Sequence, residues 1–268
     1  SDVNKLRQAT GAGMMDCKKA LEESNGDFEK AVEILRKKGQ KVAANRADRE
    51  SSEGVVLAKV SDDNTYGIII SLNCETDFVA KNEEYIQLAQ SLASHALNYS
   101  DKDSFLNSEF EGMKVSDKLL EQTGVIGEKI EIGSFEYLES EFVGSYVHAG
   151  SKIASIVGLS EKFDNADEVS KDISMQVAAM NPVALDENGV SQEIIEKEIE
   201  IAKDQLRQEG KPEEMLDNIA KGKLKKFFKE NTLVNQQFIK DNKQSISDYL
   251  KSKSENASVT GFARIGLV

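Results

Sequence analysis

The side chains that most often perform catalysis or bind metal ions are scarce in this sequence of 268 residues. It contains two histidines, His95 and His148, two cysteines, Cys17 and Cys74, and no tryptophan. No pair of these four residues has the short spacing that is typical of metal ligands, so the sequence predicts no metal site. His95 falls within a predicted helix beside apolar positions, and we interpret it as structural. The two distant cysteines indicate a reducing compartment rather than a disulfide-linked fold.

A glycine-containing segment near the N-terminus has some features of a phosphate-binding loop. Gly11 and Gly13 precede Lys18 and Lys19. However, no buried strand comes before the glycines, and no Gly-Lys-Ser/Thr sequence ends the loop. The abundant acidic residues are typical of solvated helix surfaces. The sequence therefore assembles no catalytic set, predicts no cofactor, and indicates a protein that is not an enzyme and acts through surface contacts.

Two groups of residues are candidates for such a contact surface. Thr76, Asp77 and Phe78 lie where a predicted strand ends and a helix begins. The two polar residues could cap that helix, and Phe78 is explained more simply by core packing, because another aromatic residue follows seven positions later on a similar helical face. Met14 and Met15 are adjacent, so at least one of them is expected to be exposed, and exposed methionine suits adaptable binding surfaces.

The composition restricts the class of partner. Lys and Arg number 34 against 47 Asp and Glu, which gives a net charge of −13. This balance repels phosphate backbones and disfavours a nucleic-acid binder. No apolar stretch approaches the roughly 20 residues that span a bilayer, and no basic-then-apolar leader is present, so we expect no membrane association and a cytoplasmic location.

Hydrophobic periodicity predicts the helices and strands that carry these residues. Residues 1–53 are predicted to form a three-helix module and a linker. Asp27 is the expected N-cap of the third helix and Gly39 its C-terminal stop. The second helix has an apolar face, formed by Met14, Cys17, Ala20 and Leu21.

The residues that follow this module are predicted to form an α+β fold with an internal duplication. Two units share the order strand, turn, strand and helix, with a further strand available to each. The first unit comprises residues 54–139, and the second comprises residues 140–185 and 231–268. We expect two small antiparallel sheets with packed helices.

Residues 186–230 interrupt the second unit and predict an inserted antiparallel helical hairpin. Apolar residues form one stripe on each helix, and Gly210-Lys-Pro212 breaks the chain between them. A self-packed, coiled-coil-like protrusion is the simpler interpretation. The alternative is an exposed arm that also binds a partner, and the sequence leaves self-association through the hairpin open.

Two long strings resemble the signature segments of bacterial translation elongation factor Ts, the nucleotide exchange factor for elongation factor Tu. They are Thr10-Gly-Ala-Gly-Met-Met-Asp-Cys-Lys-Lys-Ala-Leu21 and Asn73-Cys-Glu-Thr-Asp-Phe-Val-Ala-Lys-Asn82. The likeness extends through the domain order, and also includes Ile126-Gly127 and Gly144-Ser-Tyr-Val-His148. It implies a ubiquitin-associated-like fold for the N-terminal module. It also implies a non-catalytic guanine nucleotide exchange factor that binds the G domain and further domains of elongation factor Tu.

The resemblance also implies which residues contact the partner. Phe78, beside Asp77, would wedge into the G domain and disturb Mg²⁺ and phosphate coordination, which weakens GDP binding. That region comprises Thr76, Asp77, Phe78 and Val79. The other implied contact residues are Met14, Met15, Lys18, Arg46, Ile126, Gly127, His148 and Ile239.

Two rival functions stay open at this point. An adaptor with a ubiquitin-associated-like head would bind a partner tightly without accelerating nucleotide release. A small-molecule enzyme would need a polar pocket in the duplicated core, and the sequence indicates none.

Overall fold

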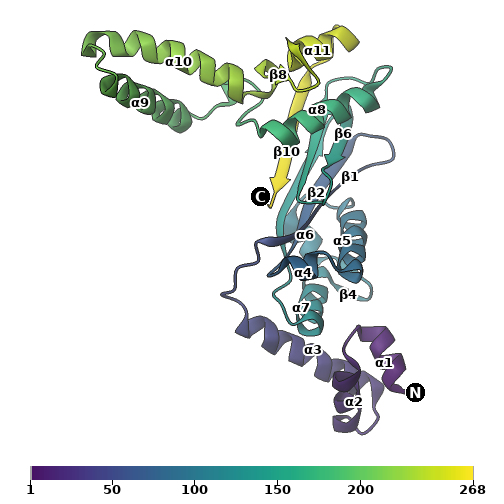
Figure 1. Ribbon diagram of the computed structural model, residues 1–268. Coiled ribbons are helices and arrows are strands. Elements are labelled where there is room, and N and C mark those ends of the chain that lie inside the picture. The colour runs from purple at the N-terminus through teal and green to yellow at the C-terminus, as the bar shows by residue number, and fades with distance from the viewer. Residues whose placement is uncertain (1, 268) are drawn as a thin grey trace.

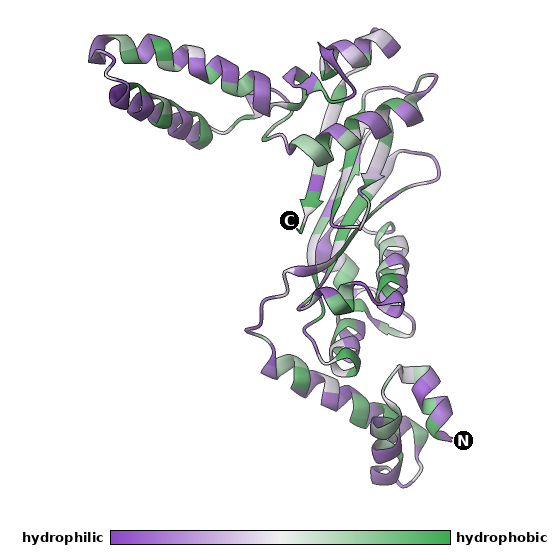
Figure 2. Ribbon diagram, viewed as in Figure 1, coloured by the Kyte–Doolittle hydropathy of each residue, from purple (hydrophilic) through white to green (hydrophobic). Residues whose placement is uncertain are grey.

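The computed structural model describes residues 2–267, and the molecule is elongated (Figure 1). Three helices lie at the N-terminal end, two sheets with packed helices occupy the middle, and a helical hairpin projects at the far end. The α+β class predicted from the sequence is confirmed. Helices such as the hairpin pair are purple along much of their length in Figure 2, whereas green concentrates in the central strands.

The N-terminal helices are α1 (Asp2–Thr10), α2 (Met14–Glu23) and α3 (Phe28–Asn45). They enclose a small core that includes Leu6, Cys17 and Ala31. Asp27 caps α3 as predicted, because its carboxylate accepts a hydrogen bond from the Lys30 N–H at 3.0 Å.

Two predictions for this region are wrong. Met14 does not share the buried face of α2 but is exposed, because the small core of this module does not extend to it. Gly39 does not end α3, which continues to Asn45. The glycine instead lies buried where α3 crosses a later helix, and its missing side chain permits close approach of the two backbones.

The first sheet has the strand order β1-β2-β5, with both pairs antiparallel. Its strands are β1 (Glu53–Val60), β2 (Tyr66–Cys74) and β5 (Glu131–Glu139). Between β2 and β5 lie α4 (Asp77–Ala80), α5 (Glu83–Ala96), α6 (Lys102–Asn107), β3 (Glu109–Phe110), β4 (Met113–Lys114) and α7 (Val115–Ile126). The sequence analysis identified α5 but did not identify the segment from α6 to α7.

The second sheet repeats this topology with the order β10-β7-β6. Its strands are β6 (Phe142–Val147), β7 (Ile153–Leu159) and β10 (Val259–Gly266). In both sheets the third strand of the unit pairs with the second, so the predicted duplication is confirmed at the level of topology. The associated elements are α8 (Ala166–Met180), η3 (Leu233–Asn235), β8 (Gln237–Phe238), β9 (Asp241–Ser245) and α11 (Ile246–Lys253).

The two sheets pack against each other through a shared apolar layer. Val56, Ile69, Val143 and Ile156 are buried in this layer. The neighbours of Ile69 in β2, Ile68 and Ile70, belong instead to the core beneath α5. Since successive strand residues point to opposite faces, a sheet covered on both sides requires the uninterrupted Ile68-Ile-Ile70 run.

The hairpin consists of α9 (Gln192–Gln208) and α10 (Leu216–Asn231), flanked by η1 (Glu187–Gly189) and η2 (Glu213–Met215). Ala202 and Leu206 of α9 are buried, as are Leu216 and Ala220 of α10. The antiparallel hairpin predicted between the second helix and the last strand is therefore confirmed.

Candidate functional site

Phe78 lies on a helix of a single turn. Thr76 is the N-cap of α4, where its Oγ1 accepts a hydrogen bond from the Val79 N–H at 3.4 Å. The turn ends at Ala80, and Asn82 caps a new helix by accepting the Tyr85 N–H at 3.2 Å. Phe78 and Tyr85 therefore do not share one helical face. Phe78 is 83% exposed and Tyr85 only 2%, so the interpretation of Phe78 as core is wrong.

Asp77 also points outward and forms a local ion pair. Its Oδ2 lies 2.7 Å from the Lys81 Nζ, one helical turn further along the chain. The hydrogen bond and charge of this lysine hold the pKa of the Asp77 carboxyl below its usual range. Asp77, the residue before Phe78, therefore carries an ionised carboxylate at neutral pH.

Two glutamates hold the segment that precedes Phe78. The Glu128 Oε2 accepts hydrogen bonds from the N–H groups of Glu75 and Thr76, at 3.1 and 3.0 Å. Its Oε1 accepts the Thr76 hydroxyl at 2.7 Å. In return, the Glu75 Oε1 accepts the Lys129 N–H at 2.7 Å. Each carboxylate thus binds the backbone of the segment that carries the other one.

Arg46 extends this network into the linker that follows α3. Its Nη1 donates to both carboxylate oxygens of Glu75, each at 2.8 Å. Burial disfavours the charged form of Glu75, but the Lys129 N–H and the Arg46 guanidinium outweigh that effect and lower its pKa. The Arg46 guanidinium is thus engaged within the chain. The sequence analysis did not single out Glu75 or Glu128, although Glu75 lies inside the second signature string.

Phe78 borders a cleft that it shares with the end of α7 and that both apolar and polar side chains line. Val79, Val125 and Ile126 line this cleft together with Phe78. Gly127, the C-cap of α7, has a φ of 80° and so adopts the left-handed conformation that glycine favours. The structure therefore brings together the Thr76–Val79 region and the Ile126-Gly127 pair, which are about fifty residues apart in the sequence.

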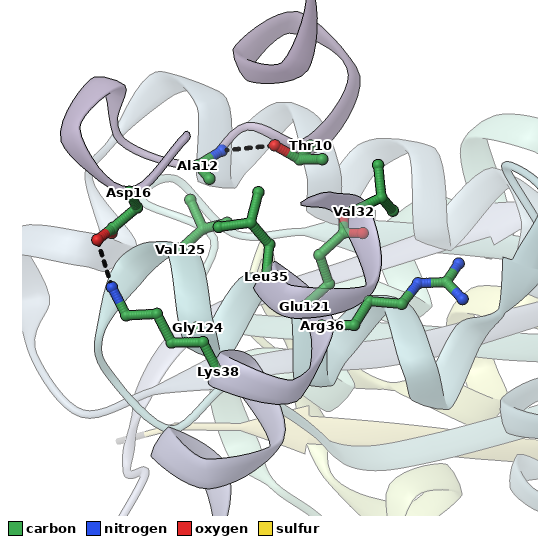
Figure 3. A pocket seen from close by; sticks show the side chains of 10 residues that line it. All are labelled: Thr10, Ala12, Asp16, Val32, Leu35, Arg36, Lys38, Glu121, Gly124 and Val125. Carbon is green, nitrogen blue, oxygen red and sulfur yellow. Dashed lines mark hydrogen bonds and ion pairs between the residues drawn. The ribbon is translucent and has the colours of Figure 1, made fainter. Parts of the chain in front are cut away.

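The N-terminal module packs against the same helix, α7. Val125 contacts its apolar core, and Figure 3 shows Val125 beside Ala12 and Leu35. An ion pair between the Asp16 Oδ1 and the Lys38 Nζ, at 2.5 Å, borders this contact. Close to it, α2 presents Met14 and Met15, which are 54% and 63% exposed. Lys18 is also largely exposed and forms only a long ion pair with Glu22.

A second cleft contains both His148 and Ile239. Its lining also includes Tyr146, Met175 and Arg264. The Tyr146 hydroxyl and the His148 Nδ1 are 2.8 Å apart, and Ile239 is 45% exposed. These two predicted contact residues, far apart in the sequence, are therefore neighbours.

The turn that carries His148 adjoins the start of β1. Lys152, in the same turn, forms an ion pair with Glu53 through its Nζ at 2.7 Å. Glu53 pairs with Cys74 in the β1–β2 register, directly before the Thr76 turn. The two clefts are therefore linked through one edge of the core.

The described residues contain neither a cluster of potential metal ligands nor a helix that could span a membrane. Among residues 2–267, no group of three or more His, Cys, Asp or Glu side chains is placed to hold a metal ion. Over the same residues, no helix is both long and apolar enough to cross a membrane.

Comparison with known proteins decides the family. The family model described as Elongation factor TS matches residues 75–267 of this chain. Elongation factor Ts of Christiangramia forsetii is 65% identical over 267 residues, covering 100% of this chain and 97% of that protein. The chain belongs to the elongation factor Ts family. Its function therefore lies in protein biosynthesis, as a translation elongation factor.

Further members of the elongation factor Ts family support the assignment over the whole chain. The protein of Flavobacterium psychrophilum is 61% identical and matches 100% of this chain and 97% of its own length. That of Porphyromonas gingivalis is 47% identical and matches 99% of this chain and 97% of its own length.

Proposed function

We propose that this protein is a non-catalytic guanine nucleotide exchange factor that binds elongation factor Tu in its GDP form and promotes GDP release. Phe78 inserts into the G domain, and the displacement disturbs the coordination of Mg²⁺ and of the GDP phosphates. The single observation that carries this proposal is the exposure of Phe78, at 83%, on a turn whose flanking residues are anchored.

Anchoring makes an exposed aromatic side chain suitable as a wedge. Ala80, on the same turn, is buried, and Val79 packs against the core of the first sheet. Hydrogen bonds to the carboxylates of Glu75 and Glu128 fix the backbone just before the turn. An aromatic residue whose backbone is already fixed loses less conformational freedom on association, so more of its burial energy is available to displace the partner's groups.

One phenylalanine is too small to account for exchange by itself. Burying a phenylalanine contributes about 1.5–3 kcal/mol. A 10⁴-fold shift in an equilibrium requires roughly 5.5 kcal/mol. The partner must therefore contact several regions, and the candidates are the exposed face of α2, the Phe78 cleft and the cleft that contains His148 and Ile239. We expect a total interface above about 2,000 Å².

Thermodynamic linkage predicts how GDP should affect the binding of this protein to elongation factor Tu. If this protein weakens the binding of GDP to elongation factor Tu, GDP must weaken the binding of this protein by the same factor. Titrating GDP into the complex should therefore release this protein.

The direct test is stopped-flow release of a fluorescent GDP from elongation factor Tu, with and without this protein. We expect acceleration by the wild type and a large loss of acceleration in Phe78→Ala. Met215→Ala is the matched control, because Met215 is also exposed but lies in η2 between the hairpin helices. Binding without acceleration would support the adaptor function instead. Acceleration that Phe78→Ala leaves intact would retain exchange but place the wedge elsewhere.

A further inference from the structure

We propose that Glu75 and Glu128 are positioning residues that together fix Phe78 relative to Ile126 and Gly127, so that two contact regions act as one rigid surface. We call the reciprocal arrangement of these two side chains the carboxylate clasp. This inference rests on the proposed exchange function, which gives Phe78 its role.

The clasp joins two segments that are distant in the sequence. One is the β2–α4 junction, which carries Glu75 and Thr76, and the other is the α7–β5 junction, which carries Glu128 and Lys129. Glu128 accepts three hydrogen bonds from the first junction, and Glu75 accepts one from the backbone of the second. Because every bond to Glu128 comes from the two residues just before Asp77, the direction in which α4 starts depends on that carboxylate.

A turn as short as α4 needs this external support. It has four residues, and helices of that length are not stable on their own. Hydrogen bonds to a charged acceptor are stronger than neutral ones, and two donors on one oxygen fix both distance and direction. Ile126 and Gly127 immediately precede Glu128, so a displacement of the clasp would move Phe78 relative to them.

Arg46 is the third member of the arrangement. Its Nη1 donates charge-assisted hydrogen bonds to both carboxylate oxygens of Glu75 and so connects the linker to the clasp. We therefore assign Arg46 a supporting role within the chain. Arg46→Ala should weaken the same contacts, whereas Arg46→Lys keeps a positive charge and a nitrogen donor and should weaken them less.

The first test needs no partner. In Glu128→Ala, both acceptor oxygens are removed, and the N–H groups of Glu75 and Thr76 lose their carboxylate partner. Amide hydrogen exchange at Glu75 and Thr76, and across residues 77–81, should then accelerate at least roughly tenfold relative to the wild type. Glu33→Ala is the matched control, because Glu33 forms an exposed ion pair with Lys37 on α3. Unchanged exchange in Glu128→Ala would overturn the clasp whether or not the protein acts on nucleotide release.

The second test asks whether the clasp acts through Phe78. At saturating concentrations of this protein, Glu128→Ala should lower the maximal rate of GDP release by roughly tenfold, with a smaller change in the half-saturating concentration. In the Phe78→Ala background, the same substitution should have almost no further effect, because coupled residues are not additive. Equal losses in both backgrounds would overturn the positioning role. If the wild type itself fails to accelerate release, the exchange function is refuted, and amide exchange still decides whether the clasp exists.

Discussion

Gly39 and Gly124 face each other where α3 crosses α7, with no side chain between the two backbones. A Cβ on Gly124 would lie 2.5 Å from the Gly39 Cα, and a Cβ on Gly39 would lie 2.8 Å from the Leu120 carbonyl oxygen. Atoms this close must move apart, and both obstacles are backbone. The crossing therefore fixes the N-terminal module on the helix that ends at Ile126.

Gly124→Ala should destabilise the protein by about 1–3 kcal/mol, the usual range for overpacking a close contact. Urea denaturation measures this change. The control is Gly222→Ala in α10, where a Cβ meets nothing within 4 Å and alanine should stabilise the helix by about 0.5–1 kcal/mol. Two variants with equal stability would show that the helices do not need this close approach.

Phe78 and Phe105 should respond oppositely in stability measurements. Phe105 is fully buried in the core of the first sheet, so Phe105→Ala should cost about 3–5 kcal/mol. Phe78→Ala should change the free energy of unfolding by no more than about 0.5 kcal/mol, because the ring is exposed. Thermal unfolding of both variants tests this difference. A large loss of stability in Phe78→Ala would mean that its ring packs against the protein in solution.

The contribution of His95 to the free energy of unfolding should fall as the solution becomes acidic. It contacts Tyr99, Phe105 and Phe110, and its Nε2 lies 2.8 Å from the Ser108 hydroxyl. Burial lowers its pKa below the usual value of 6.5. The unfolded chain therefore takes up a proton near pH 6.5, before the folded protein does. The stabilising contribution is present above that pH and is lost as pH falls toward the folded pKa.

NMR titration of the two histidines tests this directly, with His95→Gln to assign the resonance. We expect a titration midpoint for His95 below 6.5. The stability difference between wild type and variant should change between pH 7 and 5. A midpoint at or above 6.5 would contradict the prediction.

Gln176 should hold the segment that presents Ile239. This buried side chain donates to the Gln237 carbonyl at 3.0 Å and accepts the Ile239 N–H at 2.9 Å. In Gln176→Leu these backbone groups lose their partner, which costs about 1–3 kcal/mol for a buried group. We expect faster amide exchange at Ile239 in addition to lower stability in urea. Gln205→Leu on the exposed side of α9 is the control and should change stability by less than about 0.5 kcal/mol.

The sequence by itself predicted the features that depend on local pattern. Apolar runs bounded by turns located the six main strands, helical periodicity located α5, α8 and the hairpin, and the chemistry of Asp27 located the start of α3. The two signature strings carried the family resemblance, which the comparisons confirm. These signals could be read directly because each one lies within a few residues of chain.

The tertiary structure decided the features that depend on distant partners. Gly39 is a plausible helix stop until α7 packs against it, because a packed crossing overrides the weak helix propensity of glycine. Phe78 resembles a core residue until a break at Asn82 separates its turn from α5. The contact between Glu75 and Glu128 spans the whole segment from α4 to α7, and the proximity of His148 and Ile239 depends on the second sheet. Such pairings require chain closure over long distances, so no local pattern could indicate them.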